Sequence, residues 1–289
     1  MEKIKNSKIA IISHDAGAAE LLSFWIKNHK KNKYLFHIKG PAKNVFKKNK
    51  VNFKNKSINK IIKISDFVLT GTSLKSNLEI RALKISRQLS KKSYSFIDHW
   101  INYKDRFKRS GKYFLPDVFL ASDKYAFKIL KRTFKNIEIK IVKNYFLESF
   151  KKIKRDKIYK DSILFLSSNN DLNIKKKFIS DKEIIEKLIK KIIKIFPSYN
   201  NFIIRPHPTE KKNKYSFLYK KDFKNLKIKI DNYKKIESSL KKARIVIGYD
   251  TMGIVVADSM RIRSYNIDLQ SKYEKNVIPK SFYYDLLKI

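Results

Sequence analysis

The sequence of 289 residues contains no cysteine, and it has only six glycines and six prolines. The absence of cysteine excludes a disulfide framework, a zinc site built on thiolates and a catalytic thiol. Long hydrophobic runs are absent too, because the run from Ile9 to Ile12 is far shorter than the roughly 20 residues that a helix needs to cross a bilayer. No cleavage-site pattern of a secretory signal follows that run. Since 43% of the residues are hydrophobic, a core can form, and we expect a soluble, cytoplasmic, globular protein.

Acidic residues are scarce as well, with 26 Asp and Glu against 68 Lys and Arg, which gives a formal net charge of +42. Only ten of the basic residues are arginine, the side chain that specific recognition of bases and phosphates favours. The lysines are spread over every segment, and the abundant Lys, Ile, Asn, Phe and Tyr share A/T-rich codons. We therefore attribute the charge to genome composition and expect no specific nucleic-acid partner. A positive surface still favours anionic ligands and peripheral contact with the inner face of an anionic membrane.

Short apolar runs alternate with helical patterns along the chain, which is typical of α/β proteins with parallel sheets. We expect one domain over residues 1–150 and a second over 151–289. Between them, the lysine-rich stretch 150–161 has little periodicity and indicates a linker or a solvated helix face. The best-defined helix begins with a capping-box pattern formed by Ser180 and Glu183. The expected strands are 7–13, 34–38, 66–70, 93–97, 117–120, 138–142, 162–166, 202–204, 226–230, 244–247 and 262–267, and a long helix is expected over 74–89.

Polar residues gather where the expected strands end, and in open α/β sheets ligands bind beyond the carboxyl ends of the strands. In the first half, His14 and Asp15 follow one strand and His99 follows another. A carboxylate or an imidazole there can take the proton of an attacking hydroxyl group, so these three residues are candidate catalytic groups. Asp15 fits equally the N-cap of the following helix, and His99 fits a hydrogen-bonded core histidine. No Gly-x-Ser-x-Gly elbow and no metal-ligand spacing is present, so we expect neither a serine hydrolase nor a metal site.

Two strings mark strand ends in the second half. In the string RPHP at 205–208, prolines fix the backbone around His207, so the imidazole and the Arg205 cation are held on a stiff turn. That pair suits a phosphate or a ribose, and a strand-terminating turn with a surface histidine is the simpler alternative. In the string GYDTMG at 248–253, a helix begins near Thr251, whose hydroxyl and free main-chain amides suit a phosphate. An ordinary N-cap threonine has the same pattern.

The strand into RPHP, followed further along by a strand into GYDTMG and a helix, resembles the donor-binding domain of GT-B-fold enzymes. It is most similar to bacterial surface-polysaccharide proteins: capsule and sialic-acid-type transferases, glycerophosphotransferases of teichoic-acid synthesis, and UDP-N-acetylglucosamine 2-epimerases. The resemblance implies two Rossmann-like βαβ domains facing a cleft, the first on the acceptor side and the second binding a nucleotide sugar. It also implies that the catalytic base comes from the first half, where we expect Asp15. The implied donor-binding residues are Ser167, Ser168, Arg205, His207, Tyr249, Thr251, Met252 and Gly253, with His207 on the nucleotide and 251–253 around the phosphates.

The resemblance implies a metal-independent transferase that moves a glycosyl or glycerophosphoryl group to a surface-polysaccharide, lipopolysaccharide or other lipid-linked acceptor. Its donor would be a nucleotide sugar or a CDP-glycerol-type compound, and no further cofactor is expected. Three alternatives stay open: a non-enzymatic protein that binds anions or RNA through its lysines, a degenerate ligand-binding relative, and an epimerase-like isomerase of sugar nucleotides. The carboxylate-rich donor loop of the epimerases is not found in GYDTMG, which favours transfer over epimerisation.

Overall fold

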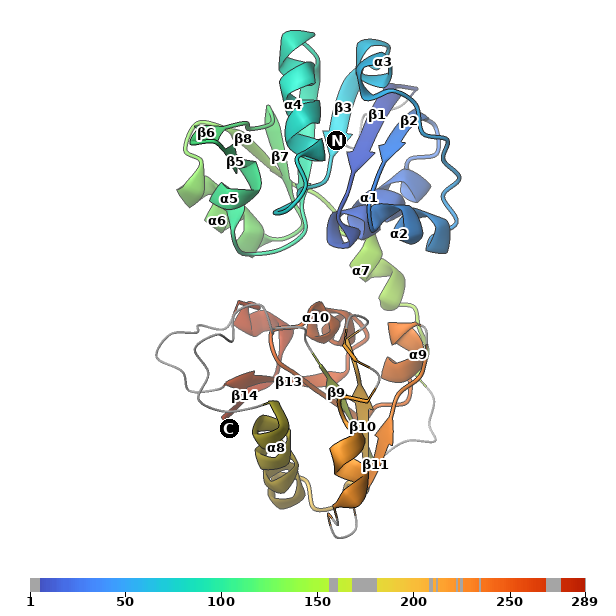
Figure 1. Cartoon of the computed structure of the whole chain (residues 1–289), viewed down its shortest axis with the longest axis vertical. Coiled ribbons are helices and arrows are strands. Elements are labelled where there is room, and N and C mark those ends of the chain that lie inside the picture. Colours follow the sequence, from blue (N-terminus) through green and yellow to red (C-terminus); the bar gives the residue numbers. More distant parts are fainter. Residues whose placement is uncertain are drawn as a thin grey trace. The chain divides into compact units, whose positions relative to one another are not determined.

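The computed structural model describes residues 6–155, 161–167, 181–207, 210–211, 213–221, 223, 226–233, 235–268 and 277–288. The chain divides into two compact units, Met1–Phe146 (unit 1) and Leu147–Ile289 (unit 2), and each is described by itself. Both contain a parallel sheet with helices packed on its faces (Figure 1). The expected α/β class with two Rossmann-like halves is therefore confirmed.

Six parallel strands form the main sheet of unit 1: β1 Lys8–Ser13, β2 Lys33–Ile38, β3 Phe67–Thr70, β4 Lys92–Ile97, β7 Val118–Ala121 and β8 Glu138–Ile141. Their order across the sheet is β2-β1-β3-β4-β7-β8. From β1 the chain moves outward to β2, crosses back to β3 on the other side of β1, and continues in one direction to β8. The connections after β1 and β3 thus leave in opposite directions, and this switch point is where open α/β sheets bind ligands.

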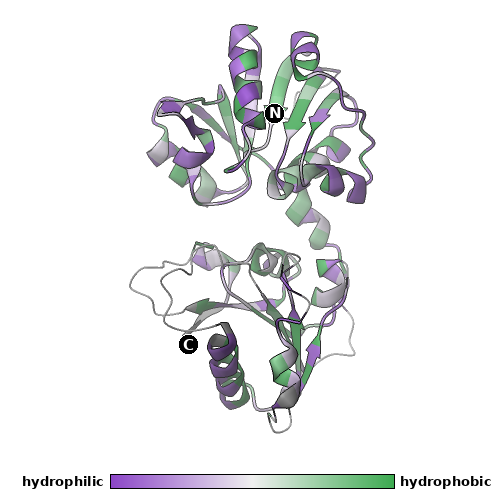
Figure 2. Ribbon diagram, viewed as in Figure 1, coloured by the Kyte–Doolittle hydropathy of each residue, from purple (hydrophilic) through white to green (hydrophobic). Residues whose placement is uncertain are grey.

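The helices up to the boundary between the units are α1 Ala16–Asn28, α2 Ala42–Lys48, α3 Ile58–Lys63, α4 Leu78–Gln88, α5 Tyr103–Phe107, α6 Lys124–Thr133 and α7 Tyr145–Phe150, and a small hairpin joins β5 Lys108–Arg109 to β6 Lys112–Tyr113. Side chains alternate between the two faces of a strand. Ile9 and Ile11 of β1 pack with α1 and α2, whereas Ala10 and Ile12 pack with α3 and α4. In Figure 2 the central strands are hydrophobic and the helices alternate in colour, as amphipathic helices do. With both faces of the sheet covered, the polar residues His14 and Asp15 fall just beyond the carboxyl end of β1.

The sheet of unit 2 is formed by β9 Ser162–Leu166, β10 Asn201–Arg205, β11 Lys227–Ile230, β12 Ile245–Gly248, β13 Arg263–Asp268 and β14 Asp285–Lys288. All neighbours are parallel, and the order β11-β10-β9-β12-β13-β14 is that of dinucleotide-binding Rossmann sheets. The chain runs outward from β9 to β11 and returns to β12 beside β9, so the switch point of unit 2 lies between β9 and β12. The described helices are α8 Asp181–Ile195, α9 Ile236–Leu240 and α10 Met252–Ser259, with 3₁₀ turns η2 Ser216–Lys220 and η3 Lys280–Phe282.

The structure corrects several boundaries expected from the sequence. The helix expected from Leu74 begins at Leu78, because the preceding loop is held by Arg109, whose guanidinium donates to the carbonyl oxygens of Ser73, Leu74 and Ser76. Strand β14 and the hairpin β5–β6 have no counterpart among the expected elements. The helix expected after the capping box is confirmed as α8, although Ser180 lies outside the described residues. Of the candidate linker, 156–160 also lie outside them.

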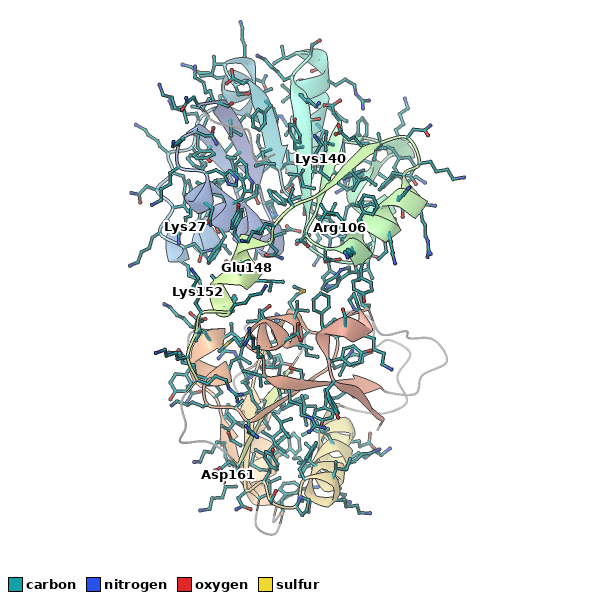
Figure 3. The ribbon with its side chains drawn as sticks, turned by 180° about the vertical axis from the view of Figure 1, so that it is seen from behind. Lys27, Arg106, Lys140, Glu148, Lys152 and Asp161 are labelled. Atoms are coloured by element: carbon teal, nitrogen blue, oxygen red, sulfur yellow. The ribbon has the colours of Figure 1, made fainter. Side chains whose placement is uncertain are left out.

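Basic side chains project from both units. Figure 3 labels Lys27 in α1 and Lys152 after α7, and both residues are exposed. The net charge of +42 is thus carried by lysines of each unit and not by one of them. Among the described residues, no helix combines the length and the apolar composition that crossing a membrane requires.

Candidate functional site

The switch point of unit 1 begins with His14 and Asp15, which follow β1 directly. His14 Nδ1 lies 2.7 Å from Asp15 Oδ1, and the two side chains are 29% and 34% exposed. The other ring nitrogen, Nε2, lies against Gly40, where a Cβ would come within 2.4 Å of it and the backbone φ is +50°. Any other residue at position 40 would displace the imidazole. The carboxylate therefore orients the imidazole, and the two groups form one hydrogen-bonded pair, which we call the His14–Asp15 pair.

The two interpretations of Asp15 can be compared directly. Asp15 occupies the N-cap position of α1, but its carboxylate makes no capping hydrogen bond there. The carboxylate bonds to His14 instead. Capping is therefore not what this side chain does, whereas its catalytic role stays a prediction.

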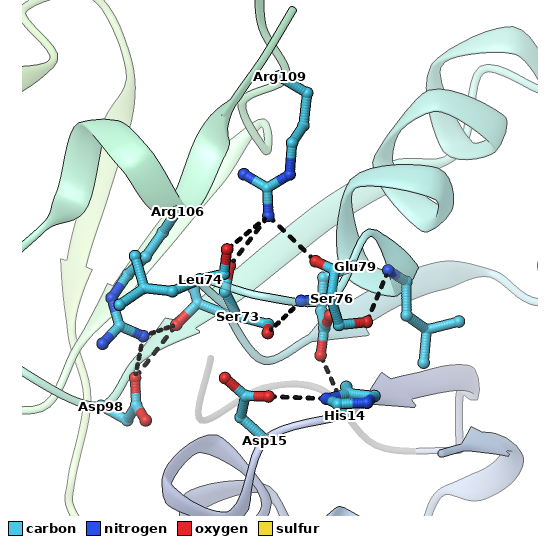
Figure 4. Close-up of polar contacts among 11 residues, drawn as sticks. His14, Asp15, Ser73, Leu74, Ser76, Glu79, Asp98, Arg106 and Arg109 are labelled. Atoms are coloured by element: carbon cyan, nitrogen blue, oxygen red, sulfur yellow. Dashed lines mark hydrogen bonds and ion pairs between the residues drawn. The ribbon is translucent and has the colours of Figure 1, made fainter. Parts of the chain in front are cut away.

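Asp98 joins the loops that follow β3 and β4. Its Oδ1 accepts hydrogen bonds from Thr72 Oγ1 and from Arg106 Nη1, both at 3.1 Å, and Arg106 Nη1 also donates to Thr72 Oγ1 at 2.8 Å. Its Oδ2 lies over Gly17 in the first turn of α1, where a Cβ would be only 2.2 Å away. The side chains of Asp98 and Arg106 are 11% and 9% exposed. This ion pair therefore fixes three segments of the switch point to one another (Figure 4).

His99 folds back on its own turn. Its Nδ1 accepts the main-chain N–H of Trp100 at 2.9 Å, and the indole of Trp100 donates to the carboxylate of Asp123. With Nδ1 as acceptor, the neutral ring carries its proton on Nε2. The neighbouring Asp98 makes bonds that join the loops, and the catalytic role of His99 stays a prediction.

Glu79 is a further residue of this switch point that the sequence pattern does not single out. It lies in the first turn of α4, is 3% exposed, and accepts the main-chain N–H of His14 at 2.6 Å through Oε1 (Figure 4). Burial raises the pKa of Glu79 to about 7, and the nearby charge of Asp15 adds to the rise. The two bonded residues are 65 positions apart, so no local pattern could have paired them.

A second buried glutamate, Glu210, organises the ends of β9 and β10 in unit 2. Its side chain is 1% exposed. The donors to its carboxylate are Lys214 Nζ at 2.6 Å, Ser167 Oγ at 2.7 Å, the main-chain N–H of His207 at 2.9 Å and the hydroxyl of Tyr215 at 3.0 Å. Burial alone would raise the pKa of Glu210, but the hydrogen bonds from Lys214, Ser167 and His207 outweigh it and hold the pKa below its ordinary value. The sequence could have indicated this residue, because Glu210 lies only three positions after His207 and such a separation allows a local bond across a turn.

His207 is half-buried at the mouth of β10. Burial lowers its pKa, the charge of Lys214 acts in the same direction, and Glu210 opposes them. The imidazole is therefore neutral at pH 7, with one nitrogen that donates and one that accepts. Such a ring suits the polar groups of a nucleotide. Pro208, the second proline of the string, lies outside the described residues.

Arg205 is engaged inside unit 2. Its Nη1 lies 2.9 Å from Asp231 Oδ2 and also donates to the carbonyl oxygen of Tyr233 and the hydroxyl of Ser239. The Asp231 side chain is 1% exposed and that of Arg205 is 15% exposed. The guanidinium thus ties β10 to the segment after β11 and to α9. Help with donor binding, which the resemblance implied for Arg205, stays a prediction and has to be compatible with these bonds.

The turn between β12 and α10 completes the switch point of unit 2. Thr251 is the N-cap of α10, and its hydroxyl accepts the N–H of Gly253 at 3.4 Å. A Cβ at Gly253 would come within 2.5 Å of Leu166 Cδ1, so only glycine lets α10 begin this close to the end of β9. Asp250 has a φ of +41° and is held by two hydrogen bonds of 2.9 Å with Asn266.

The fold therefore brings most of the expected donor-binding residues of unit 2 to one edge of its sheet. Ser167 and His207 meet through Glu210, and Gly253 packs on the last residue of β9. Tyr249 and Met252 are half-buried beside Thr251, whereas Ser168 lies outside the described residues. Within the described part of the chain, no group of three or more His, Asp or Glu side chains is arranged to hold a metal ion.

The sequence matches no protein-family model and no curated protein. Solved structures match in fold. The UDP-GlcNAc 2-epimerase from Methanocaldococcus jannaschii is 17% identical, with a TM-score of 0.63 over 91% of this chain and 84% of its own. The UDP-GlcNAc 2-epimerase from Neisseria meningitidis, solved bound to UDP-GlcNAc, is 11% identical with a TM-score of 0.59 over 89% and 82%. MurG from Acinetobacter baumannii is 9% identical, with a TM-score of 0.59 over 92% and 79%.

These identities are low, so the likeness shows the fold and nothing finer. The neighbours are proteins of the GT-B fold, and the fold class expected from the RPHP and GYDTMG strings is confirmed to that level.

Proposed function

We propose that this chain is a sugar-nucleotide enzyme that transfers a glycosyl group from a nucleotide-activated donor to a polysaccharide or lipid-linked acceptor. The observation that carries the proposal is the switch point of unit 2, where Ser167, His207 and the turn 251–253 lie at one sheet edge. The same fold occurs in a protein solved with UDP-GlcNAc. Transfer of a glycerophosphoryl group from a CDP-glycerol-type donor is the variant of the reaction that the same site would support.

The donor's diphosphate would lie at the start of α10. Main-chain N–H groups of the first turn and the hydroxyl of Thr251 are placed to donate to phosphate oxygens. His207, neutral at pH 7, would bond to polar groups of the nucleotide. As the bond between the sugar and the diphosphate breaks, negative charge grows on the leaving nucleotide, and donors already fixed in place stabilise that charge. In this scheme they do so in place of a metal ion.

The His14–Asp15 pair of unit 1 is the proposed base. The acceptor's hydroxyl oxygen forms the new bond to the sugar, and its proton has to leave as it attacks. Asp15 would take that proton, and its bond to His14 lets the imidazole share the charge. The pair is partly exposed, so a substrate hydroxyl group can reach it.

Epimerisation of a sugar nucleotide is the second candidate. Several of the structural neighbours, including those from Methanocaldococcus jannaschii and Neisseria meningitidis, are UDP-GlcNAc 2-epimerases by name. An epimerase has to remove and return a proton on the sugar itself and needs no acceptor. Unit 1 offers one partly exposed carboxylate for such work at its switch point, that of Asp15.

Donor binding is tested by calorimetric titration of UDP and UDP-GlcNAc into the full chain. The native protein is expected to bind, and His207→Ala is expected to lose at least tenfold in affinity. His37→Ala is the matched control, because His37 belongs to β2 of unit 1 and its ring bonds to a main-chain carbonyl group. Equal affinity of the native chain and His207→Ala for every sugar nucleotide tried would overturn the proposal. Binding of RNA with a steep salt dependence and no effect of His207→Ala would favour the anion-binding alternative instead.

Transfer and epimerisation are separated by incubating the protein with UDP-GlcNAc and following the sugar by NMR. An epimerase produces the C2 epimer without any acceptor. A transferase leaves the configuration at C2 intact and releases UDP when an acceptor is supplied. Appearance of the C2 epimer in the absence of acceptor would replace the first candidate by the second.

A further inference from the structure

Glu79 holds the main chain at the point where β1 ends. It reaches from the first turn of α4 to the main-chain N–H of His14, at 2.6 Å. This N–H is the first one after Ser13, the last residue of β1. The bond therefore sets where the strand stops and where the turn with the His14–Asp15 pair begins.

The second oxygen of Glu79 has no such partner. Within the described part of the chain, Oε2 is buried and unbonded, and the hydroxyl of Ser13 is also buried and unbonded. The groups that act on the carboxyl group are its own main-chain N–H and that of His14, together with the side chains of Asp15 and His14. None of these is a lysine or an arginine. A buried carboxylate with so few donors is costly to ionise.

The pKa of the Glu79 carboxyl group lies close to neutral pH. Burial raises the pKa of Glu79 to about 7, and the charge of Asp15 acts in the same direction. The protonated and the ionised forms of Glu79 are therefore both populated near pH 7. Each form makes a different bond to His14, because an ionised acceptor forms the stronger hydrogen bond.

We propose that Glu79 is the positioning residue of the His14–Asp15 pair, and that its proton sets how firmly the turn with this pair is held. The ionised carboxylate holds the His14 main chain through a charge-assisted bond. The protonated form makes a weaker bond to the His14 main chain, so the turn is held less firmly.

The catalytic consequence rests on the proposed function, in which the His14–Asp15 pair takes the acceptor's proton. Glu79 is buried and does not touch substrate, so it acts through the pair. Turnover is then expected to rise as Glu79 loses its proton. The structural part of the proposal needs no substrate and can be tested alone.

The direct test follows main-chain amide signals of the full chain labelled with ¹⁵N-histidine, which gives one signal for each of the five histidines. From pH 5 to pH 9 the amide proton of His14 is expected to shift with a midpoint of about 7. Glu79→Gln is expected to remove this step, because the glutamine oxygen still accepts the bond but does not ionise. A His14 step of the same size in the native chain and in Glu79→Gln would overturn the proposal, as would its absence from the native chain.

Two controls separate this effect from a general loss of structure. The amide of His207 bonds to Glu210, which stays ionised over the same pH range, so Glu210 adds no step near pH 7 and the signal is expected to follow only the His207 ring, whose pKa lies below its ordinary value. Glu210→Gln is expected to leave the His14 step unchanged. If Glu79→Gln does not fold, the ¹³C signal of the Glu79 carboxyl group in the native protein gives its midpoint directly, and a midpoint below pH 5 would overturn the proposal.

A pH profile of turnover keeps the two proposals apart. Glu79→Gln is expected to flatten the profile around neutrality while its affinity for UDP stays native. A clear His14 step in a chain that turns over no sugar nucleotide would contradict the proposed function and support the positioning role. Turnover in a chain without the His14 step would support the function and contradict the positioning role.

Discussion

Each unit contains a buried glutamate that accepts the main-chain N–H of a histidine at a strand end. Glu79 bonds to His14 in unit 1 at 2.6 Å, and Glu210 bonds to His207 in unit 2 at 2.9 Å. The further partners differ. Glu210 also receives bonds from an ammonium group and two hydroxyl groups, whereas Glu79 has an oxygen without any partner among the described residues.

The two carboxyl groups consequently differ in charge. Hydrogen bonds hold the pKa of Glu210 below its ordinary value in spite of burial, and burial raises the pKa of Glu79 to about 7. At neutral pH, Glu210 is a fixed anion inside a saturated network, and Glu79 exchanges its proton. The same contact with a histidine main chain is thus a rigid support in unit 2 and an adjustable one in unit 1.

The largest expected effect comes from removing the support in unit 2. Glu210→Ala leaves Lys214, Ser167, Tyr215 and the His207 amide without their acceptor, so we expect a loss of about 4 kcal/mol in the free energy of unfolding. Hydrogen exchange of the unit 2 strands measures it. Ser167→Ala, which removes only one donor, is the control and is expected to cost about 1 kcal/mol. A loss for Glu210→Ala no larger than the control would show that the network does not stabilise unit 2.

Arg205 and Arg106 extend the comparison, because each forms an ion pair with an aspartate in its own unit. Arg205→Ala leaves the carboxylate of Asp231, which is 1% exposed, buried without its ion-pair partner. We therefore expect unit 2 to lose about 3 kcal/mol in its free energy of unfolding. Arg106→Ala removes the ion-pair partner of Asp98, which is slightly more exposed, and is expected to lower the free energy of unfolding of unit 1 by about 2 kcal/mol. Denaturant unfolding measures both. Native stability of Arg205→Ala together with a large loss of UDP affinity would instead assign the guanidinium to the donor.

Glu79→Gln is expected to act in the opposite direction. A carboxyl group with a raised pKa gives its full contribution to stability below its unfolded pKa and loses it as pH rises through about 7. The variant avoids this loss, so it is expected to match the native chain near pH 4 and to be more stable by about 3 kcal/mol at pH 9. Unfolding in urea at the two pH values measures the difference. A variant less stable than the native chain at pH 9 would contradict the assignment.

The smallest expected effect concerns the N-cap of α10. Thr251→Ala removes the acceptor of the Gly253 amide and is expected to cost about 1 kcal/mol in the stability of unit 2. Thr133→Ala is the control, because that hydroxyl bonds to a helix carbonyl group in unit 1. If Thr251 also donates to the donor's phosphate, the variant loses UDP affinity beyond the change in stability, which calorimetry detects. Unchanged affinity would confine Thr251 to capping.

The alternation of strands and helices was enough to predict parallel sheets in two halves, because buried strands and amphipathic helices differ in hydrophobic period. The Rossmann-like form of the two halves was implied by the resemblance to GT-B-fold enzymes. Residues 74–77 were wrongly assigned to the following helix. Leu74 fits the helical pattern, and the sequence does not show that Arg109 holds the carbonyl groups of this loop. Strand β14 was missed because it has only four residues, and nothing in that short string shows that it pairs with β13.

The candidate site was predictable only as far as its strand ends. His14, Asp15 and His207 follow strands in the sequence, and the rule for open α/β sheets places them at the sheet edge. Glu79 and Arg106 come from other elements and meet that edge through contacts of long sequence separation. Their roles depend on burial and on which donors surround them, and neither quantity can be derived from one sequence.

The central claim is that the switch point of unit 2 binds the nucleotide of a sugar nucleotide. Its most direct test adds UDP to the full chain labelled with ¹⁵N-histidine and follows the ring and amide signals of the five histidines. We predict that the signals of His207 shift and saturate, while those of His29 and His37 in unit 1 stay in place. Unmoved His207 signals, or equal gradual shifts of all five histidines as expected from diffuse binding to lysines, would contradict the account.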